Sequence, residues 1–438
     1  MTDLASRSKQ ELTQLHAQAL SDYEAFRARR LRLDMTRGKP SPEQLDLSVG
    51  MLSLPGNGDY TTEGGEDARN YGGGPQGLPE ARALFAEALG APVAQIMAAD
   101  NSSLALMHDC LVYALLKGVA GGAAPWAGER PIAFLCPVPG YDRHFGICED
   151  FGIGMLPVPL TGQGPDMDVV EKLVADPSVK GMWCVPQYSN PTGETYSDET
   201  VRRLGAMRTG APDFRLFWDN AYAVHHLTGH RHKVANILDT CTAAGFPNRA
   251  FVFASMSKVT FGGAGLAFFA SSPENLRWLV ARANRRSIGP DKLNQLRHVR
   301  FLRDAAGLNA LMDAHRAILA PKFAAVTAAL EARLGGTGAA RWMHPEGGYF
   351  ITLDVMDGCA KRVVTLAGEA GLALTPAGAT YPLGLDPHDR TLRLAPSYPT
   401  LDEVRVAAEG ISICVELACL EALLRESSRG AAPLRLQA

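Results

Sequence analysis

The chain has 438 residues, of which 46% are hydrophobic and 20% charged, a composition typical of a globular protein long enough for two domains. Its formal net charge of −3 argues against a basic surface for nucleic acid, so we expect no nucleic-acid partner. We also expect no membrane partner, because no apolar run approaches the length of a membrane span. The cysteines form no C-x-x-C pair, and no signal peptide is recognisable, which favours reduced thiols in a cytoplasmic protein.

Residues 1–50 combine a predicted helix with a proline-containing loop. Apolar side chains recur at helical spacing over residues 11–31, which predicts an amphipathic helix. The loop that follows contains Gly38 between Arg37 and Lys39, with two prolines close behind. From these residues alone, the loop is either a basic surface turn or a segment that faces an acidic substrate.

The stretch at residues 51–82 is rich in glycine and polar residues, so we expect little regular structure there. Tyr71 stands within it, in the run NYGGGPQG. An aromatic side chain in such a loop is either a packing anchor or a ligand-binding group, and both interpretations stay open. Residues 79–89 are expected to form a short helix.

A longer helix is predicted where Leu104 begins a helically spaced apolar run that continues to Lys117. Asn101, Ser102 and Ser103 precede this run, and Asn101 or Ser102 is a good N-cap. The free N–H groups of a helix N-terminus attract anions. The segment is therefore either a plain capped helix or an anion-binding one.

Apolar runs then alternate with helical or loop stretches. They span residues 131–136, 153–158, 180–186, 214–218, 250–254 and 265–270. This alternation predicts a mostly parallel sheet with helices on both faces, in which ligands bind outside the carboxyl ends of the strands. Tyr141, Asn190, Asp219 and Lys258 each lie just past one of these runs. The predicted sheet therefore gathers four residues, far apart in sequence, into one crevice.

Lys258 lies in a polar turn between two apolar runs, after Ser255 and Ser257 and before a cluster of glycines. Removal from water in such a place lowers the pKa of an amine and makes it available as a nucleophile. The two serines are suited to binding an anion, and the glycines allow a close approach of backbone to a ligand. On this stretch alone, a Schiff-base lysine over a phosphorylated cofactor and an edge-strand lysine with loop serines are both open.

The chain from residue 290 onward predicts a second, smaller domain. Helices are expected at residues 290–318, 320–335 and 400–425, and strands within 342–355 and at 391–395. The first of these helices would link the two domains.

Four histidines are close together in the sequence: His225, His226, His230 and His232. No acidic or cysteine ligand completes a metal-binding spacing around them. We interpret them as loop histidines and expect no metal.

Three motifs follow one another in a fixed order: SNPTG at residues 189–193, DNAY at 219–222 and SMSK ending at Lys258. In order and spacing, they resemble the fold-type I enzymes that use pyridoxal 5′-phosphate (PLP), specifically the aspartate aminotransferase superfamily. The resemblance covers roughly residues 30–400. It is carried by the combination, because each motif alone is common.

The resemblance implies an α/β fold of the PLP-dependent transferase type. Residues 51–314 would form a large PLP-binding domain with a mostly parallel seven-stranded sheet. Residues 1–50 would supply an N-terminal arm and part of a smaller α+β domain, which residues 315–438 complete. The resembled enzymes are homodimers, so we expect a homodimer here.

By the same resemblance, residues that follow the strands would hold the cofactor and carry out catalysis. Lys258 would form the Schiff base, and Asp219 would keep the ring nitrogen of PLP protonated by pairing with its charged form. Asn190 and Tyr222 match the donors to the phenolic oxygen, and Tyr141 matches the aromatic residue that stacks on the ring. The catalytic residues would be Lys258, Asp219 and Tyr222.

The phosphate of PLP would be bound by side chains and amides from two loops. These are Asn101, Ser102, Ser103, Ser255 and Ser257. Tyr71 matches a tyrosine that reaches the phosphate of the neighbouring subunit's cofactor. The substrate would be bound by Gly38, Asn190 and Arg393, with Arg393 holding the α-carboxylate through a bidentate contact.

One position departs from the resembled pattern. The family usually carries an arginine eight residues after the lysine, and Leu266 stands there. Arg285, Arg286 and Lys292 are alternative cations for the phosphate, and the sequence does not rank them. The departure resembles a divergent subgroup near the aminotransferase domains of MocR-type regulators.

The resemblance implies an aminotransferase that moves an amino group from an amino acid, with aspartate or glutamate as first candidates, to a 2-oxo acid. A PLP-dependent lyase or decarboxylase would use the same residues, so the sequence leaves that alternative open. A non-catalytic, effector-binding domain of the MocR kind is the other alternative. Only about 30 residues precede the loop around Gly38, too few for the DNA-binding module of such regulators.

Overall fold

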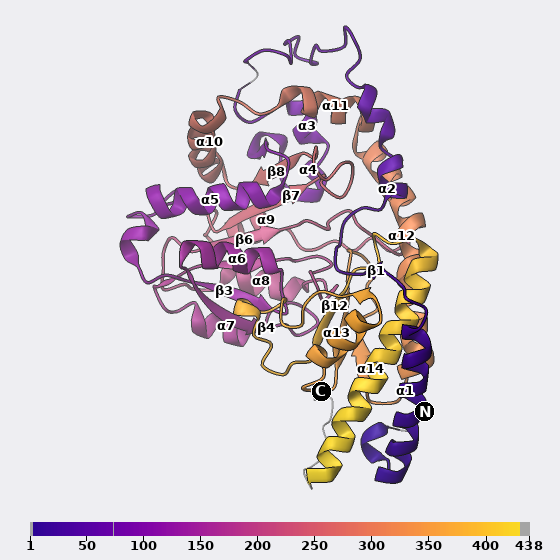
Figure 1. Cartoon of the computed structure of the whole chain (residues 1–438). Coiled ribbons are helices and arrows are strands. Elements are labelled where there is room, and N and C mark those ends of the chain that lie inside the picture. The colour runs from indigo at the N-terminus through magenta and orange to yellow at the C-terminus, as the bar shows by residue number, and fades with distance from the viewer. Residues whose placement is uncertain (1–2, 73, 430–438) are drawn as a thin grey trace.

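The computed structural model describes residues 3–72 and 74–429, and a seven-stranded sheet forms its larger part (Figure 1). The strands lie in the order β2-β8-β7-β6-β5-β3-β4. Their bounds are β2 Ile96–Ala98, β3 Ala133–Val138, β4 Gly154–Pro159, β5 Val179–Cys184, β6 Arg215–Asp219, β7 Ala250–Ser255 and β8 Ala267–Ala270. β8 runs opposite to the other six strands of this sheet, pairing antiparallel with β2 and β7, while the remaining pairs are parallel. The predicted α/β fold with a mostly parallel seven-stranded sheet is confirmed.

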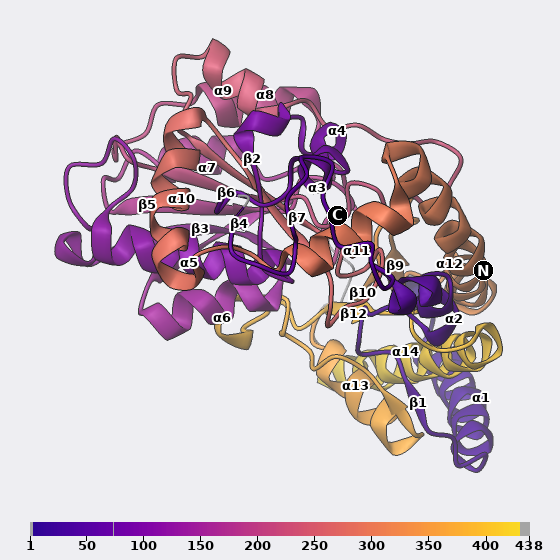
Figure 2. The ribbon, with the colours of Figure 1, turned by 90° about the horizontal axis from the view of Figure 1, so that it is seen from above.

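The central strands β5, β6 and β7 are buried at every position, which explains why they appear in the sequence as unbroken apolar runs. Successive side chains alternate between two cores. Phe217 of β6 packs with α5 (Ser103–Lys117), α6 (Asp142–Phe151) and α10 (Pro273–Ser287). Its neighbour Trp218 packs in the opposite core. Figure 2 shows α8 and α9 on one side of the strands and α5 and α6 on the other.

The helices of the second face are α8 Asp198–Ala206 and α9 Ile237–Ala243, with the short α3 Pro79–Ala83, α4 Ala86–Leu89 and α7 Met167–Leu173. Further single-turn 3-10 helices lie at residues 4–6, 49–53, 93–95, 126–129 and 382–384. The strand order reverses at β3, which pairs with β4 on one edge and β5 on the other. Such a reversal opens a crevice at the carboxyl ends of the strands.

A smaller antiparallel sheet has the order β12-β10-β9, with bounds Thr391–Leu394, Ile351–Val355 and Ala340–Trp342. Long helices pack around it: α1 Lys9–Arg27, α12 Ala305–Leu334, α13 Ala360–Glu369 and α14 Leu401–Arg429. The N-terminal segment belongs to this part, because α1 packs against α14 and β1 (Leu33–Asp34) pairs with β11 (Leu372–Ala373). These contacts support the proposed grouping of residues 1–50 with the C-terminal part.

The expected helices at residues 290–318 and 320–335 are divided differently in the structure. The helices are α11 Lys292–Leu302 and α12 Ala305–Leu334, and Pro321 stays inside α12. The break falls at Arg303, which takes a left-handed φ of 69°, and Asp304 then caps α12 by accepting a hydrogen bond from Gly307 N at 2.9 Å. The packing of α12 on α14 offsets the hydrogen bond that the proline removes.

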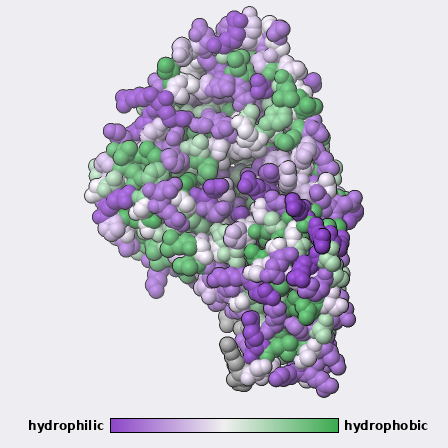
Figure 3. Space-filling view, in the orientation of Figure 1, coloured by the Kyte–Doolittle hydropathy of each residue, from purple (hydrophilic) through white to green (hydrophobic). Residues whose placement is uncertain are grey.

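Polar and apolar residues are interspersed on the face shown in Figure 3. None of the described helices combines the length and apolar character needed to cross a bilayer.

Candidate functional site

A cavity of about 220 Å³ lies past the carboxyl ends of β5, β6 and β7. Most of the residues that the sequence predicts for the cofactor line it. They are Ser102, Ser103, Tyr141, Asn190, Asp219, Tyr222, Ser255, Ser257 and Lys258. The crevice expected from the strand pattern therefore exists, and it brings these residues together.

The N-terminus of α5 and the turn after β7 are bonded to each other at one end of the cavity. Ser102 is the N-cap of α5, and its Oγ accepts a hydrogen bond from Leu104 N at 3.2 Å. Ser257 Oγ donates to Asn101 O at 3.1 Å. A Cβ at position 265 would lie 3.0 Å from Asn101 O, so the close approach requires Gly265. Ser102 lines the cavity, whereas Asn101 does not and contacts the turn after β7 instead.

None of the three cations suggested for the phosphate lines the cavity among the described residues. Arg286 pairs instead with Asp100 at 2.7 Å and with Asp109 at 3.0 Å. Lys292 Nζ donates to Gly72 O. At this end the described lining offers serine hydroxyls and the helix N-terminus.

Asp219, the last residue of β6, is 3% exposed and lies deep in the cavity wall. His144 Nε2 lies 3.2 Å from Asp219 Oδ2, so the ring nitrogen donates to the carboxylate. The imidazole stacks on Trp183, with ring centroids 4.4 Å apart. Asp219 Oδ1 has no hydrogen-bond partner among the residues that the structure describes. One oxygen is thus anchored, and the other is free to accept from a cationic N–H group.

Lys258 Nζ lies 5.0 Å from the centroid of the Tyr222 ring. Burial lowers the pKa of Lys258, and the negative charge of Asp219 opposes this shift. Burial also raises the pKa of Tyr222 well above its ordinary value, and it raises that of Tyr141 to about 12. The site therefore shifts the Lys258 amine toward its neutral form and keeps the two phenols protonated.

Arg393 reaches the same region from β12. Its Nη1 lies 3.1 Å from Asp142 Oδ1 and 3.4 Å from Asn190 Oδ1. The guanidinium lies 4.9 Å from the centroid of the Phe350 ring. Gly38 packs directly against the same ring. A Cβ at position 38 would lie only 2.3 Å from Phe350 Cζ, so only glycine fits there. The three predicted substrate residues, Gly38, Asn190 and Arg393, are thus connected through shared contacts.

Tyr71 does not join this group within one chain. Its side chain is 79% exposed. It lines a separate cavity of about 610 Å³, together with Ile288 and Lys292. Its predicted role belongs to the cofactor of a second subunit, and this single chain leaves that role as a prediction.

Sequence reasoning missed His144 at the site and interpreted His225 only as a loop histidine. His144 lies three residues after Tyr141, on the first turn of α6, and this spacing was the available signal. His225 packs edge-on against Tyr222 and Tyr349, with ring centroids 5.8 and 5.5 Å away. Burial, and then the charge of Lys258, hold the pKa of His225 well below its ordinary value, so the ring is neutral.

Two further histidines of the cluster, His226 and His232, have side-chain partners. His226 Nδ1 lies 2.7 Å from Tyr188 OH, and His232 pairs with Glu346. No group of three or more metal-ligating side chains occurs within residues 3–72 and 74–429.

Comparison with known proteins gives the same picture. The sequence model of the family described as aspartate amino-transferase matches residues 7–427. An aspartate aminotransferase of Corynebacterium glutamicum is 50% identical over 406 residues, which cover 93% of this chain and 94% of that protein.

Solved structures extend the likeness to the fold. An aspartate transaminase from Corynebacterium glutamicum superposes with a TM-score of 0.94 at 48% identity, covering 96% of this chain and 99% of that chain. An alpha-aminoadipate aminotransferase from Thermus thermophilus, solved with N-(5′-phosphopyridoxyl)-L-leucine, has a TM-score of 0.70 at 22% identity, over 93% of this chain and 98% of that one, and shows the shared fold alone. The chain therefore belongs to the aspartate aminotransferase family of fold-type I enzymes, and it is an aminotransferase.

Proposed function

We propose that the protein binds PLP in the cavity around Lys258 and transfers the amino group of aspartate or glutamate to a 2-oxo acid. The observation that carries the proposal is the pair formed by Lys258 and Asp219, an amine with a lowered pKa and a buried carboxylate with one free oxygen. The name of the 50% identical relative, aspartate aminotransferase, supports aspartate as the donor.

The residues present fit PLP at each end. Asp219 Oδ1 is suited to accept from a protonated pyridine nitrogen, and His144 holds the other oxygen in place. Ser255 and the N-terminus of α5 offer donors to a phosphate. The Ser257 hydroxyl would join them by giving up its hydrogen bond to Asn101 O. Bound PLP would withdraw electrons from the bond to be broken at the substrate's Cα.

The protein's own groups would then position the substrate and move a proton. Arg393 would hold the α-carboxylate, because its Nε has no partner among the described residues and its Nη1 already orients toward Asn190. The lowered pKa of Lys258 raises the share of neutral amine, which is the form that can take a proton from Cα and return it. Tyr222 and Asn190 would donate to the phenolic oxygen of the cofactor.

We also propose that the protein works as a cytoplasmic homodimer, with Tyr71 completing the site of the partner subunit. The exposure of Tyr71, beside the exposed Ile288, supports an interface at this surface. All eight cysteines are free and buried, which supports a reducing compartment.

The decisive experiment is product analysis. Purified protein with PLP, aspartate and 2-oxoglutarate should form oxaloacetate and glutamate in equal amounts, and Lys258→Ala should form neither. Alanine, tyrosine and 2-aminoadipate serve as competing donors. Release of ammonia or carbon dioxide without a matching amount of new amino acid would replace the proposal by lyase or decarboxylase chemistry.

A further inference from the structure

Gln44, on the short helix α2 (Pro42–Asp46), is fully buried and uses all the hydrogen-bonding groups of its amide. Its Nε2 lies 2.9 Å from Tyr349 OH and 2.7 Å from His315 Nδ1. Its Oε1 accepts a hydrogen bond from Ser41 N at 3.1 Å. Because two N–H groups and one oxygen each have a partner, the orientation of the amide is determined.

Both partners of Gln44 also form a hydrogen bond with the backbone of the turn that carries Lys258. Tyr349 OH donates to Lys258 O at 3.3 Å, and His315 Nε2 lies 3.0 Å from Val259 O. A carbonyl only accepts, so His315 carries its proton on Nε2 and accepts from Gln44 at Nδ1. Burial lowers the pKa of His315 to about 4, which keeps this neutral tautomer at neutral pH.

We propose that Gln44 is a positioning residue, which holds the consecutive carbonyls of Lys258 and Val259 through two hydrogen-bonded arms, Tyr349 and His315. This inference rests on the proposed role of Lys258. The arms come from distant parts of the chain, since Tyr349 precedes β10 and His315 lies on α12. Both are buried, at 0% and 1% exposure, so the carbonyls gain protein donors where water has no access.

The same contacts join the Lys258 turn to the loop around Gly38. Ser41, whose N–H donates to Gln44 Oε1, follows Gly38 by three residues. Phe350, on which Gly38 packs, follows Tyr349 directly. A shift of the Gly38 loop would therefore displace the donors on the turn. The arrangement couples the position of the substrate-binding loop to that of the amine.

Tyr349→Phe tests the proposal, because it removes one hydroxyl and leaves the ring. We expect kcat with aspartate to fall about tenfold, as misplacement of a catalytic group costs rate, while KM stays within about twofold. The amides of Val259 and Thr260 donate to Met256 O. In the variant, hydrogen–deuterium exchange at these two amides should be faster than in the wild type, both with and without PLP.

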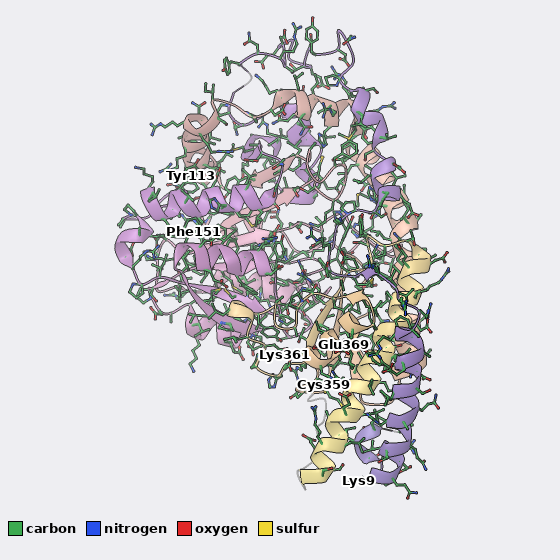
Figure 4. All side chains as sticks on the ribbon, viewed as in Figure 1. Lys9, Tyr113, Phe151, Cys359, Lys361 and Glu369 are labelled. Carbon is green, nitrogen blue, oxygen red and sulfur yellow. The ribbon has the colours of Figure 1, made fainter. Side chains whose placement is uncertain are left out.

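Tyr23→Phe is the matched control. Tyr23 is a buried tyrosine whose hydroxyl also donates to a backbone carbonyl, Leu366 O at 3.0 Å, and it contacts Glu369. Glu369 lies on α13, in the lower part of Figure 4. Tyr23→Phe should lower stability by a similar amount and leave kcat and the exchange at Val259 unchanged.

Gln44→Met removes both arms and is the second variant. Its fold-loss in kcat should be at least that of Tyr349→Phe. The double variant should lose less than the product of the two single fold-losses, because both substitutions remove the hydrogen bond between Gln44 and Tyr349. The proposal is overturned if Tyr349→Phe and Gln44→Met keep the kcat of Tyr23→Phe and the wild-type exchange at Val259. If the wild type itself makes no oxaloacetate, the proposed function fails, and the exchange measurement still tests the contacts.

Discussion

Arg393 has a buried guanidinium with one contact to Asp142 and one to Asn190, and its Nε has no partner within residues 3–72 and 74–429. A buried bidentate contact with a carboxylate costs about 2–5 kcal/mol when one partner is truncated. Arg393→Ala should therefore raise KM at least about thirtyfold, and by a similar factor for aspartate, glutamate and alanine, since all share the α-carboxylate.

Steady-state kinetics with the three donors checks this prediction, with Arg362→Ala as control. Arg362 pairs with Glu421 on α14, away from the cavity residues. A loss confined to aspartate and glutamate would assign Arg393 to the side-chain carboxylate instead.

The residues that contact a cofactor were easier to predict than the residues behind them. Lys258, Asp219 and Asn190 lie directly after apolar strands, and the parallel sheet brings the ends of such strands together. His144 contacts Asp219 while its ring stacks on Trp183. This contact depends on how α6 packs on β5, which the spacing of His144 from Tyr141 does not by itself reveal.

At the scale of elements, Glu194 connects the loop of Asn190 to the neighbouring turn. It is 6% exposed, and its two carboxylate oxygens accept from Gly162 N at 3.0 Å and Gly164 N at 3.1 Å. Its own carbonyl accepts from Ser189 N at 2.9 Å. Burial raises the pKa of Glu194 to about 7, against the opposing effect of the two N–H donors.

This raised pKa predicts a pH-dependent stability. Between about pH 4.5 and 7, the folded protein holds a proton on Glu194 that the unfolded chain releases, so the free energy of unfolding falls as pH rises through this window, by up to about 3 kcal/mol. Glu194→Gln stays neutral and should remove that part of the slope. Urea unfolding at pH 5 and pH 7.5 measures it.

Glu199→Gln is the control for this measurement, because Glu199 is exposed and pairs with Arg202 on the surface. It should keep the wild-type slope. An unchanged slope in Glu194→Gln would mean that the two backbone donors hold the carboxylate ionised across the whole window.

Helices and strands were predicted correctly where the pattern of apolar residues was long. The predictions failed where this pattern was short or ambiguous. The apolar runs for β3 to β8 lie within a few residues of the observed strands. In β5 to β8 every position is buried, which selects apolar residues throughout. β2 has three residues, too few for a pattern. Two helices were expected to meet near residue 319, yet tertiary packing keeps α12 continuous there, with Pro321 inside it.

At the scale of the whole molecule, exposed apolar side chains gather around one surface cavity. Tyr71 is 79% exposed and Ile288 is 59% exposed, and with Leu293 they line one cavity. Such a cluster favours an interface with another protein surface. In a two-fold homodimer, this surface would bring Tyr71 of each subunit to the site of the other.

Subunit mixing tests this arrangement. Protomers carrying Tyr71→Phe keep an intact Lys258, and protomers carrying Lys258→Ala keep an intact Tyr71, so one of the two sites in each hybrid dimer receives both residues. After unfolding and joint refolding of equal amounts, half of the dimers should be hybrids, and activity should return to about a quarter of the wild-type value. If phenylalanine impairs too little, Tyr71→Trp replaces it. Lack of recovery, with hybrids verified by differently tagged subunits, would show that Tyr71 serves its own subunit or no site at all.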